Sequence, residues 1–231
     1  METTRYPERV RIGISSCLLG ELVRYDGGHK KDRFLVDLFG KYVDWVPVCP
    51  EVEMGLSIPR DNMRLVEEGN EIRLVAPKTK TDYTTRMKRF AAQRISALMG
   101  ERVAGFIFKR ASPSCGLHQV RVYKDRVPGP RSQGLFAAAL TQSEPTLPVE
   151  EEGRLNDPRL RENFVARVFA QARWTGITEK RLTRGALMEF HAAHKYALMA
   201  HSQQGMRRLG NSSGTGPKNL QREGAGGWIL G

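Results

Sequence analysis

Three cysteines, Cys17, Cys49 and Cys115, are the residues of this sequence best suited to chemistry. Each follows a short apolar segment and lies in a loop that contains Gly, Ser or Pro. Cysteine thiolates bind soft metals and iron–sulfur clusters, and three of them would leave one iron of a 4Fe-4S cluster open to substrate or water. They lie 32 and 66 residues apart, whereas structural zinc sites usually contain ligand pairs about two to four residues apart. The pattern indicates a shared metal site.

Two alternatives remain for the cysteines. A zinc ion could be held by the three thiolates and a histidine, with His29 or His118 as the fourth ligand. The cysteines could also be ordinary buried residues, because free cysteine is among the most buried residue types. Their common position in loops after apolar segments favours a metal site over this second alternative.

Two polar residues accompany the cysteines. Glu51 lies two residues after Cys49, and Ser112 lies three residues before Cys115. A carboxylate beside an open iron could transfer protons to or from a substrate, and a hydroxyl could position water. The alternative is that Glu51 is a solvated loop carboxylate and Ser112 a turn residue before proline.

Short apolar segments at 10–14, 44–48 and 103–108 read as strands, and each precedes one cysteine. Apolar residues recur at helical spacing over 83–98, and Gly100 provides a stop. Strands that alternate with helices predict an α/β fold with a Rossmann-like parallel sheet and crossover helices. Ligand sites in such sheets lie outside the carboxyl ends of the strands, so we expect the cysteines to converge there.

A short all-α segment is expected after the sheet. One helix begins after Asp157 as N-cap, with Pro158 in its first turn, and another runs over about 178–202. Eight of the last thirty residues are glycine, which predicts a disordered tail. The expected organisation is a sheet domain at 1–145, a linker with prolines and glutamates at 146–156, an incomplete helical domain at 157–202, and the tail at 203–231.

Three histidines, His191, His194 and His201, lie on the last predicted helix. The first two are separated by about one turn, and the last two by about two turns, so they share a face. A metal site is one interpretation of this pattern. A packed or RNA-facing surface is the more common use of such histidines.

The chain has 37 basic and 25 acidic residues and a net charge of +12. Residues 1–150 and 151–231 each carry a net charge of +6, although the second part is about half as long. This density favours an anionic partner such as RNA, unless the charge serves only solubility. The sequence has neither a long apolar run nor a signal-peptide pattern at its start, so we expect a cytoplasmic protein with no membrane partner.

The three cysteine motifs together resemble those of the 2-thiouracil desulfidase family. The resemblance covers residues 9 to about 145 and rests on three strings in the same order, S-S-C-L-L-G-x-x-V-R-Y-D-G-G, C-P-E-V-E-M-G-L-S-I-P-R and K-R-A-S-P-S-C-G. From Asp157 onward, most clearly in E-F-H-A-A-H-K-Y-A-L-M-A-H-S, the chain resembles a second domain of unknown function that is often fused to the first. That second resemblance stops near Ser202, before the domain is complete.

The first resemblance implies a 4Fe-4S cluster held by Cys17, Cys49 and Cys115, with the fourth iron free for a substrate sulfur. It further implies that Glu51 transfers protons and that Ser112 is its partner. The expected reaction removes sulfur from a thiolated pyrimidine base or nucleoside, either free or within tRNA bound through the basic second part. The alternative from another functional class is a non-catalytic RNA-binding or redox-sensing module, in which the metal only shapes a surface.

Overall fold

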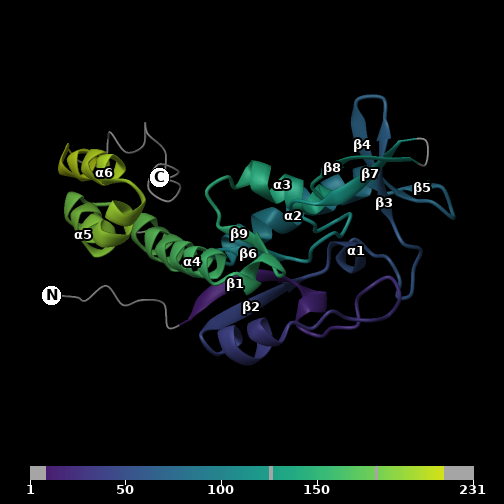
Figure 1. The fold of residues 1–231 in the computed structure, drawn as a ribbon, viewed down its shortest axis with the longest axis horizontal. Coiled ribbons are helices and arrows are strands. Elements are labelled where there is room, and N and C mark those ends of the chain that lie inside the picture. The colour runs from purple at the N-terminus through teal and green to yellow at the C-terminus, as the bar shows by residue number, and fades with distance from the viewer. Residues whose placement is uncertain (1–8, 125–126, 180–181, 216–231) are drawn as a thin grey trace.

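A four-stranded parallel sheet, sheet A, forms the centre of the protein in a computed structural model that describes residues 9–124, 127–179 and 182–215 (Figure 1). Neighbouring strands of sheet A all run parallel. The predicted α/β fold with crossover helices is therefore confirmed. The strands, in spatial order, are β2 (Val43–Val48), β1 (Val10–Ser15), β6 (Phe106–Phe108) and β9 (Val149–Glu151).

Both faces of sheet A are buried. Successive side chains of a strand point to opposite faces, and in β6 Phe106 and Phe108 enter one core whereas Ile107 enters the other. The first core contains apolar residues of α2 (Thr84–Gly100) and α3 (Leu135–Ser143). The second core contains residues of α4 (Pro158–Thr178) and of the short helical turns η2 (Phe34–Leu38) and η3 (Phe39–Lys41). Burial on both faces explains why β6, with Phe106, Ile107 and Phe108, is apolar throughout.

A second sheet, sheet B, was not foreseen from the sequence. Its strands β3 and β7 pair parallel, and its other neighbours pair antiparallel. Leu65, Leu74 and Val122 of this sheet share a core with Met87 of α2. Sheet B therefore packs against the helical layer that covers sheet A. In spatial order the strands are β5 (Thr81–Asp82), β4 (Glu71–Ala76), β3 (Arg64–Glu68), β7 (Val120–Lys124) and β8 (Val127–Ser132).

The predicted linker at 146–156 contains the last strand of sheet A and the helical turn η4 (Arg154–Asn156). Val149 lies opposite Phe106 in the parallel register of β9 with β6. The run of glutamates suggested an exposed loop, yet Glu150 and Glu151 are only 9% and 1% exposed. The local run of charges indicated solvent exposure, but the pairing of β9 with the distant strand β6 determines the position of these residues.

Helix α4 begins as expected and packs directly on sheet A. The Asp157 carboxylate caps it by accepting hydrogen bonds from the backbone N–H groups of Arg159 and Leu160, at 2.8 and 3.2 Å. Phe164 and Val168 of α4 lie in the second core, beside strands β1 and β6. A Cβ added at Gly105 would lie 2.6 Å from Val168 Cγ2, so the absence of a side chain there permits the close approach of α4.

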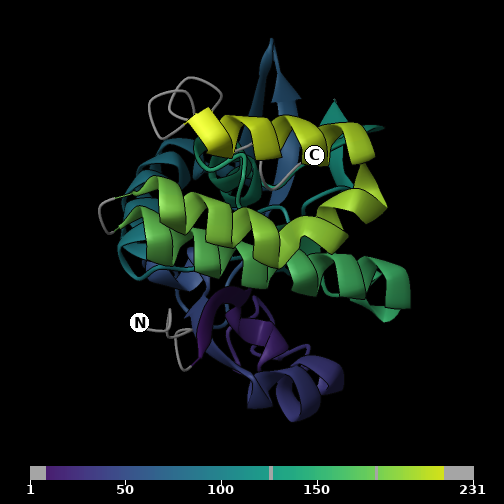
Figure 2. The same ribbon diagram turned by 90° about the vertical axis from the view of Figure 1, so that its left-hand side faces the viewer.

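The helical part continues beyond the position where the sequence predicted disorder. Helix α5 (Arg184–His201) is followed by α6 (Gln203–Thr215), and α4, α5 and α6 lie one above another (Figure 2). The prediction of a disordered tail was therefore wrong for 203–215, because α6 packs on α5: His191 Nε2 lies 3.0 Å from the carbonyl oxygen of Met206. Residues 216–231 lie outside the described part. Within the described part, none of the helices combines the length and apolarity needed to span a bilayer.

Candidate metal centre

The three cysteines follow the carboxyl ends of three adjacent strands of sheet A. Cys17 lies in the short turn η1 (Ser16–Leu18) directly after β1, and Cys49 directly follows β2. Cys115 lies in the loop between β6 and β7. Strand β1 is central, with β2 on one side and β6 on the other, so the chain reverses its order at β1. Such a switch point is where parallel α/β sheets usually bind ligands.

Burial and the charges of neighbouring groups act on the pKa values of the three thiols. Burial is the main cause that raises the pKa of each thiol, and it raises that of Cys17 to about 11. A charge on Cys49 would further raise the pKa of both Cys17 and Cys115. Metal ligands are thiolates, so a bound metal must displace these protons and offset the desolvation of the sulfurs.

Cys49 is held by the helical turn that follows it. Helix α1 (Pro50–Glu53) begins immediately after Cys49, with Pro50 in its first position. The Glu53 carboxylate accepts a hydrogen bond of 2.7 Å from the backbone N–H of Cys49, and its other oxygen lies 3.1 Å from Arg94 Nε. The Cys49 thiol lies 3.8 Å from the carbonyl oxygen of Val23. These contacts fix the direction in which the cysteine leaves β2.

The loop that carries Cys115 is fixed by side chains on both sides of the cysteine. Ser112 Oγ accepts hydrogen bonds from the backbone N–H groups of Ser114 and Cys115, at 3.3 and 3.1 Å. The buried carboxylate of Glu151, at the end of β9, accepts hydrogen bonds from the backbone N–H groups of Leu117 and His118, at 2.8 and 3.2 Å. Glu151, from the run of glutamates, therefore holds the loop that carries Cys115.

Glu51 lies between two polar partners. Its Oε1 accepts a hydrogen bond of 2.8 Å from the hydroxyl of Ser114, the residue next to Cys115. Its Oε2 lies 2.6 Å from Arg60 Nη2. The family resemblance implies Ser112 as the partner of Glu51, whereas in the structure the hydrogen bond to Glu51 comes from Ser114. The reason is the turn at 112–115, which directs the Ser112 hydroxyl at backbone N–H groups.

A positive charge lies beside Cys17. Lys109 lowers the pKa of the Cys17 thiol, although burial outweighs this effect. The ammonium group of Lys109 forms an ion pair with Glu152 and a hydrogen bond of 2.9 Å to the carbonyl oxygen of Arg110. The backbone N–H of Lys109 donates to Ser15 Oγ at 3.0 Å, and the Ser15 hydroxyl also hydrogen-bonds to Cys115. Ser15, the last residue of β1, therefore connects this strand with the segment that follows β6 and carries Cys115.

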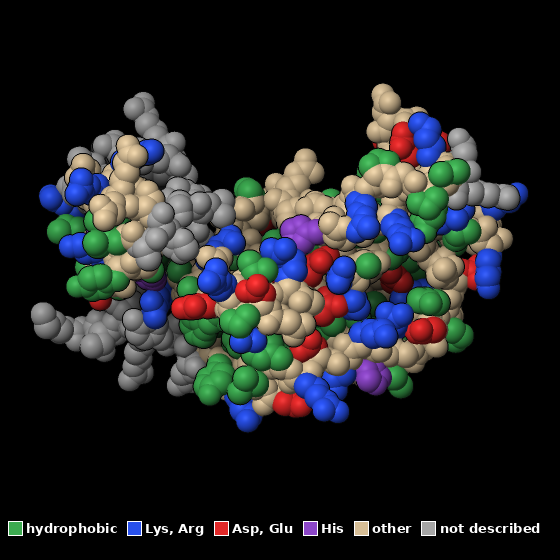
Figure 3. All heavy atoms as spheres, viewed as in Figure 1, with side chains coloured by type: hydrophobic (Ala, Val, Ile, Leu, Met, Phe, Trp, Pro, Cys, Tyr) green, Lys and Arg blue, Asp and Glu red, His purple; other side chains and the backbone are tan. Residues whose placement is uncertain are grey.

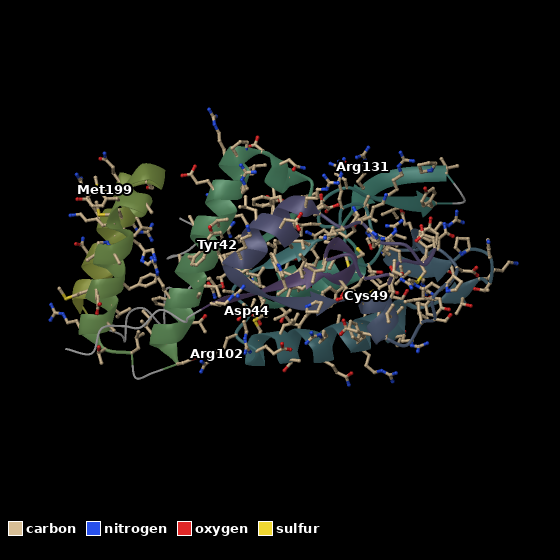
Figure 4. The ribbon with its side chains drawn as sticks, turned by 90° about the horizontal axis from the view of Figure 1, so that it is seen from below. Tyr42, Asp44, Cys49, Arg102, Arg131 and Met199 are labelled. Atoms are coloured by element: carbon tan, nitrogen blue, oxygen red, sulfur yellow. The ribbon has the colours of Figure 1, made fainter. Side chains whose placement is uncertain are left out.

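The histidines lie in other surroundings. His29 and His118, the expected fourth ligands of a zinc ion, are exposed. Both ring nitrogens of His194 have partners, the carbonyl oxygen of Phe190 at 2.8 Å and Arg173 Nη1 at 3.2 Å, so His194 serves helix packing. The side chain of His201 lies outside the described residues. Figure 4 shows Cys49 among the sheet elements and Met199 on α5, well apart, so these helices do not line the cysteine site.

The geometry bears on the kind of metal. Among the described residues, no group of three or more His, Cys, Asp or Glu side chains is arranged to hold a metal ion. The thiolates of one zinc ion must all reach a common centre over bonds of about 2.3 Å. In a cluster, each thiolate binds its own iron, so the thiolates can lie farther apart.

Several residues around the cysteines were not predicted from the sequence. Ser114 and Arg60 lie within the strings that carry the family resemblance, so their position in the motifs was an available signal. Glu53 lies in the first turn after Cys49, where a carboxylate can bind the free backbone N–H groups at the start of a helix. Glu151 and Glu152 gave no such signal, because their role depends on the pairing of β9 with β6.

Three comparisons with known proteins found matches to this chain. A family model described as 2-thiouracil desulfurase matches residues 12–152. The solved structure of TudS, a 4Fe-4S-dependent thiouracil desulfidase, is similar with a TM-score of 0.54 at 28% identity, covering 68% of this chain and 99% of TudS. The uncharacterized protein YbgA of Escherichia coli strain K12 is 38% identical over 56 residues, which are 24% of this chain. That match spans about a third of YbgA, 33% of its length.

The raised thiol pKa values predict the reactivity of the metal-free protein. At pH 7 Cys17 should react with iodoacetamide about 100-fold more slowly in the folded than in the unfolded chain, because a rise of two pKa units lowers the thiolate fraction to that extent. The rate should climb as the pH approaches 11. The protonated thiol favours the folded state, so its contribution to stability should be full below pH 9 and be lost between 9 and about 11. The alkylation rate of Cys17 can be measured by mass spectrometry with and without guanidinium. Equal rates under the two conditions would contradict the raised pKa.

Proposed function

Because this chain belongs to the 2-thiouracil desulfurase family, we propose that it hydrolyses the carbon–sulfur bond of a thiolated pyrimidine with a 4Fe-4S cluster as cofactor. The reaction converts the thiocarbonyl compound and water into the carbonyl compound and hydrogen sulfide, so atoms balance and no net electron transfer is needed. The observation that carries the proposal is the convergence of three thiols and the Glu51–Ser114 pair at the ends of β1, β2 and β6.

The donor set suits the cluster. Cys17, Cys49 and Cys115 are soft sulfur ligands, and three of them leave one iron of a 4Fe-4S cluster without a protein ligand. Lys109 and the Ser15 hydroxyl provide a positive charge and a hydrogen-bond donor beside the sulfurs. Both favour thiolates over thiols and so support cluster binding. When bound, the cluster would supply an open iron that accepts the substrate sulfur and polarises its bond to carbon.

Glu51 is the proposed proton-transfer group. Its carboxylate is 14% exposed, so the proton it exchanges passes in a largely dry environment. As a general base it takes a proton from the water that attacks the carbon, and as an acid it returns a proton to the departing sulfur or to the ring. Ser114 donates to Oε1 of Glu51 and lies next to Cys115, so it connects the carboxylate with the side of the site where the metal would bind.

The substrate class follows from the same site and the surrounding charge. A free base such as 2-thiouracil needs only the metal centre and the Glu51–Ser114 pair. Lys and Arg side chains are spread over the face seen in Figure 3, and the net charge is +12, which supports thiouridine within tRNA as an alternative substrate. Phosphate contacts would then add affinity that a free base cannot use.

Glu51→Gln tests the proposed role of the carboxylate. Under anaerobic conditions the wild-type protein should convert 2-thiouracil into uracil and one equivalent of sulfide. The variant should lose turnover by about 100-fold or more, since positioned acid–base groups contribute about that much. It should keep its iron, because Glu51 is not a thiolate ligand. Uracil measured by chromatography, together with iron and sulfide assays, gives both quantities.

Glu71→Gln, an exposed change on β4, is the matched control and should turn over as the wild type does. Wild-type rates in Glu51→Gln would refute the role of Glu51. A loaded protein that releases no sulfide from any thiolated pyrimidine would favour the non-catalytic RNA-binding or redox-sensing module. Thiolated tRNA assayed in parallel at low and high salt would separate the two substrates, since phosphate contacts weaken with salt.

Alanine substitutions at Ser114 and Ser112 should affect different properties of the enzyme. Ser114→Ala removes a hydrogen bond to a charged group and should lower kcat by about tenfold with iron content unchanged. Ser112→Ala removes the acceptor for the N–H groups of Ser114 and Cys115, so its main effect should be poorer retention of iron. Ser96→Ala, exposed on α2, is the control. The reverse pattern, with iron lost in Ser114→Ala and kcat lost at full iron in Ser112→Ala, would restore Ser112 as the partner of Glu51.

A further inference from the structure

Arg60 is a buried arginine directly behind Glu51. Its side chain is 7% exposed. Two of its nitrogens, Nε and Nη2, lie 2.8 and 2.6 Å from the same carboxylate oxygen, Oε2 of Glu51. Nη2 also donates to the carbonyl oxygen of Val23 at 2.9 Å, and Nη1 donates to that of Ser57 at 3.4 Å. The guanidinium is therefore held rigidly by the surrounding backbone.

The two oxygens of Glu51 consequently have different roles. Oε2 is occupied by two charged N–H donors, which is a strong arrangement because both partners are ionised. Oε1 faces the Ser114 hydroxyl at 2.8 Å, on the side of the loop that carries Cys115. Arginine on one side and serine on the other leave the carboxylate a single orientation. Only Oε1 is then placed to exchange a proton at the reaction centre.

Arg60 also connects segments that carry two of the thiols. Its backbone N–H donates to the carbonyl oxygen of Tyr25 at 2.9 Å, in the loop that follows Cys17. The Val23 carbonyl that accepts from its guanidinium also lies 3.8 Å from the Cys49 thiol. The backbone contact does not depend on the side chain, whereas the Glu51 contact does. Side-chain substitutions can therefore separate positioning of Glu51 from positioning of the loop.

We propose that Arg60 is a positioning residue for the reaction, which holds Glu51 in the orientation that presents Oε1 to substrate and water. The inference rests on the proposed function, since it assigns Arg60 a part in that reaction. A planar guanidinium can direct two donors at one oxygen, whereas a lysine ammonium is a single flexible point charge. Lysine at this position should therefore preserve the charge but lose much of the orientation.

The test compares Arg60→Gln and Arg60→Lys with the wild type, with rates expressed per loaded cluster. We expect Arg60→Gln to lower kcat about tenfold or more, with KM changed by less than about threefold, because orientation of a catalytic group is needed in the transition state more than in substrate binding. Arg60→Lys should recover part of kcat. Iron and sulfide content and the visible spectrum should match those of the wild type in both variants.

Arg86→Gln is the matched control, because Arg86 is exposed on α2 and its guanidinium lies beside Gly55 of the loop that leads to Arg60. It should leave kcat unchanged. A wild-type kcat in Arg60→Gln, or a fall in kcat that only follows a fall in iron content, would overturn the inference. If the glutamine variant does not fold, Arg60→Lys decides, since a wild-type kcat there would exclude an orienting role. Absence of turnover in the wild type would instead refute the proposed function.

Discussion

The parallel pairing of β1 with β2 and β6 is the interaction on which the site depends. Parallel neighbours end at the same edge of a sheet, so three cysteines that are 32 and 66 residues apart are delivered to one place. Pairing in a parallel sheet requires crossovers, and α2 and the turns η2 and η3 supply them. Both faces must also be covered, which α4 does on one side and α2 with α3 on the other.

The surroundings of the three cysteines favour the protonated thiol over the thiolate. Burial raises the pKa of Cys17, Cys49 and Cys115, so a metal bound by them would have to offset deprotonation and desolvation of the sulfurs. The backbone is already fixed at two of these cysteines, which would lower the cost of binding a metal. Glu53 binds the N–H of Cys49, and Ser112 binds that of Cys115. A rigid frame of this kind loses little conformational entropy when a cluster binds.

The sequence predicted the elements that depend on local signals. Alternation of apolar strands with a periodic helix gave the parallel sheet, and Asp157 before Pro158 gave the start of α4. It did not predict β9, a strand of three residues whose pairing with β6 is long-range. It also did not predict sheet B, in which the hairpins β3–β4 and β7–β8 are joined by the long-range parallel pairing of β3 with β7. Glu151 illustrates the limit: three adjacent glutamates indicate a solvated loop, and only the pairing of β9 with β6 buries this carboxylate at the Cys115 loop. Helix α6 was missed because its packing on α5 overrides its glycines.

The central claim is that one cluster is held jointly by the three strand-end cysteines. The most direct measurement is iron and acid-labile sulfide per chain, with the visible spectrum, for the wild type and for Cys17→Ser, Cys49→Ser and Cys115→Ser after anaerobic reconstitution. The account predicts about four irons and four sulfides in the wild type and loss of the cluster in every variant. Stoichiometric zinc in the wild type, or a full cluster in any one variant, would contradict it.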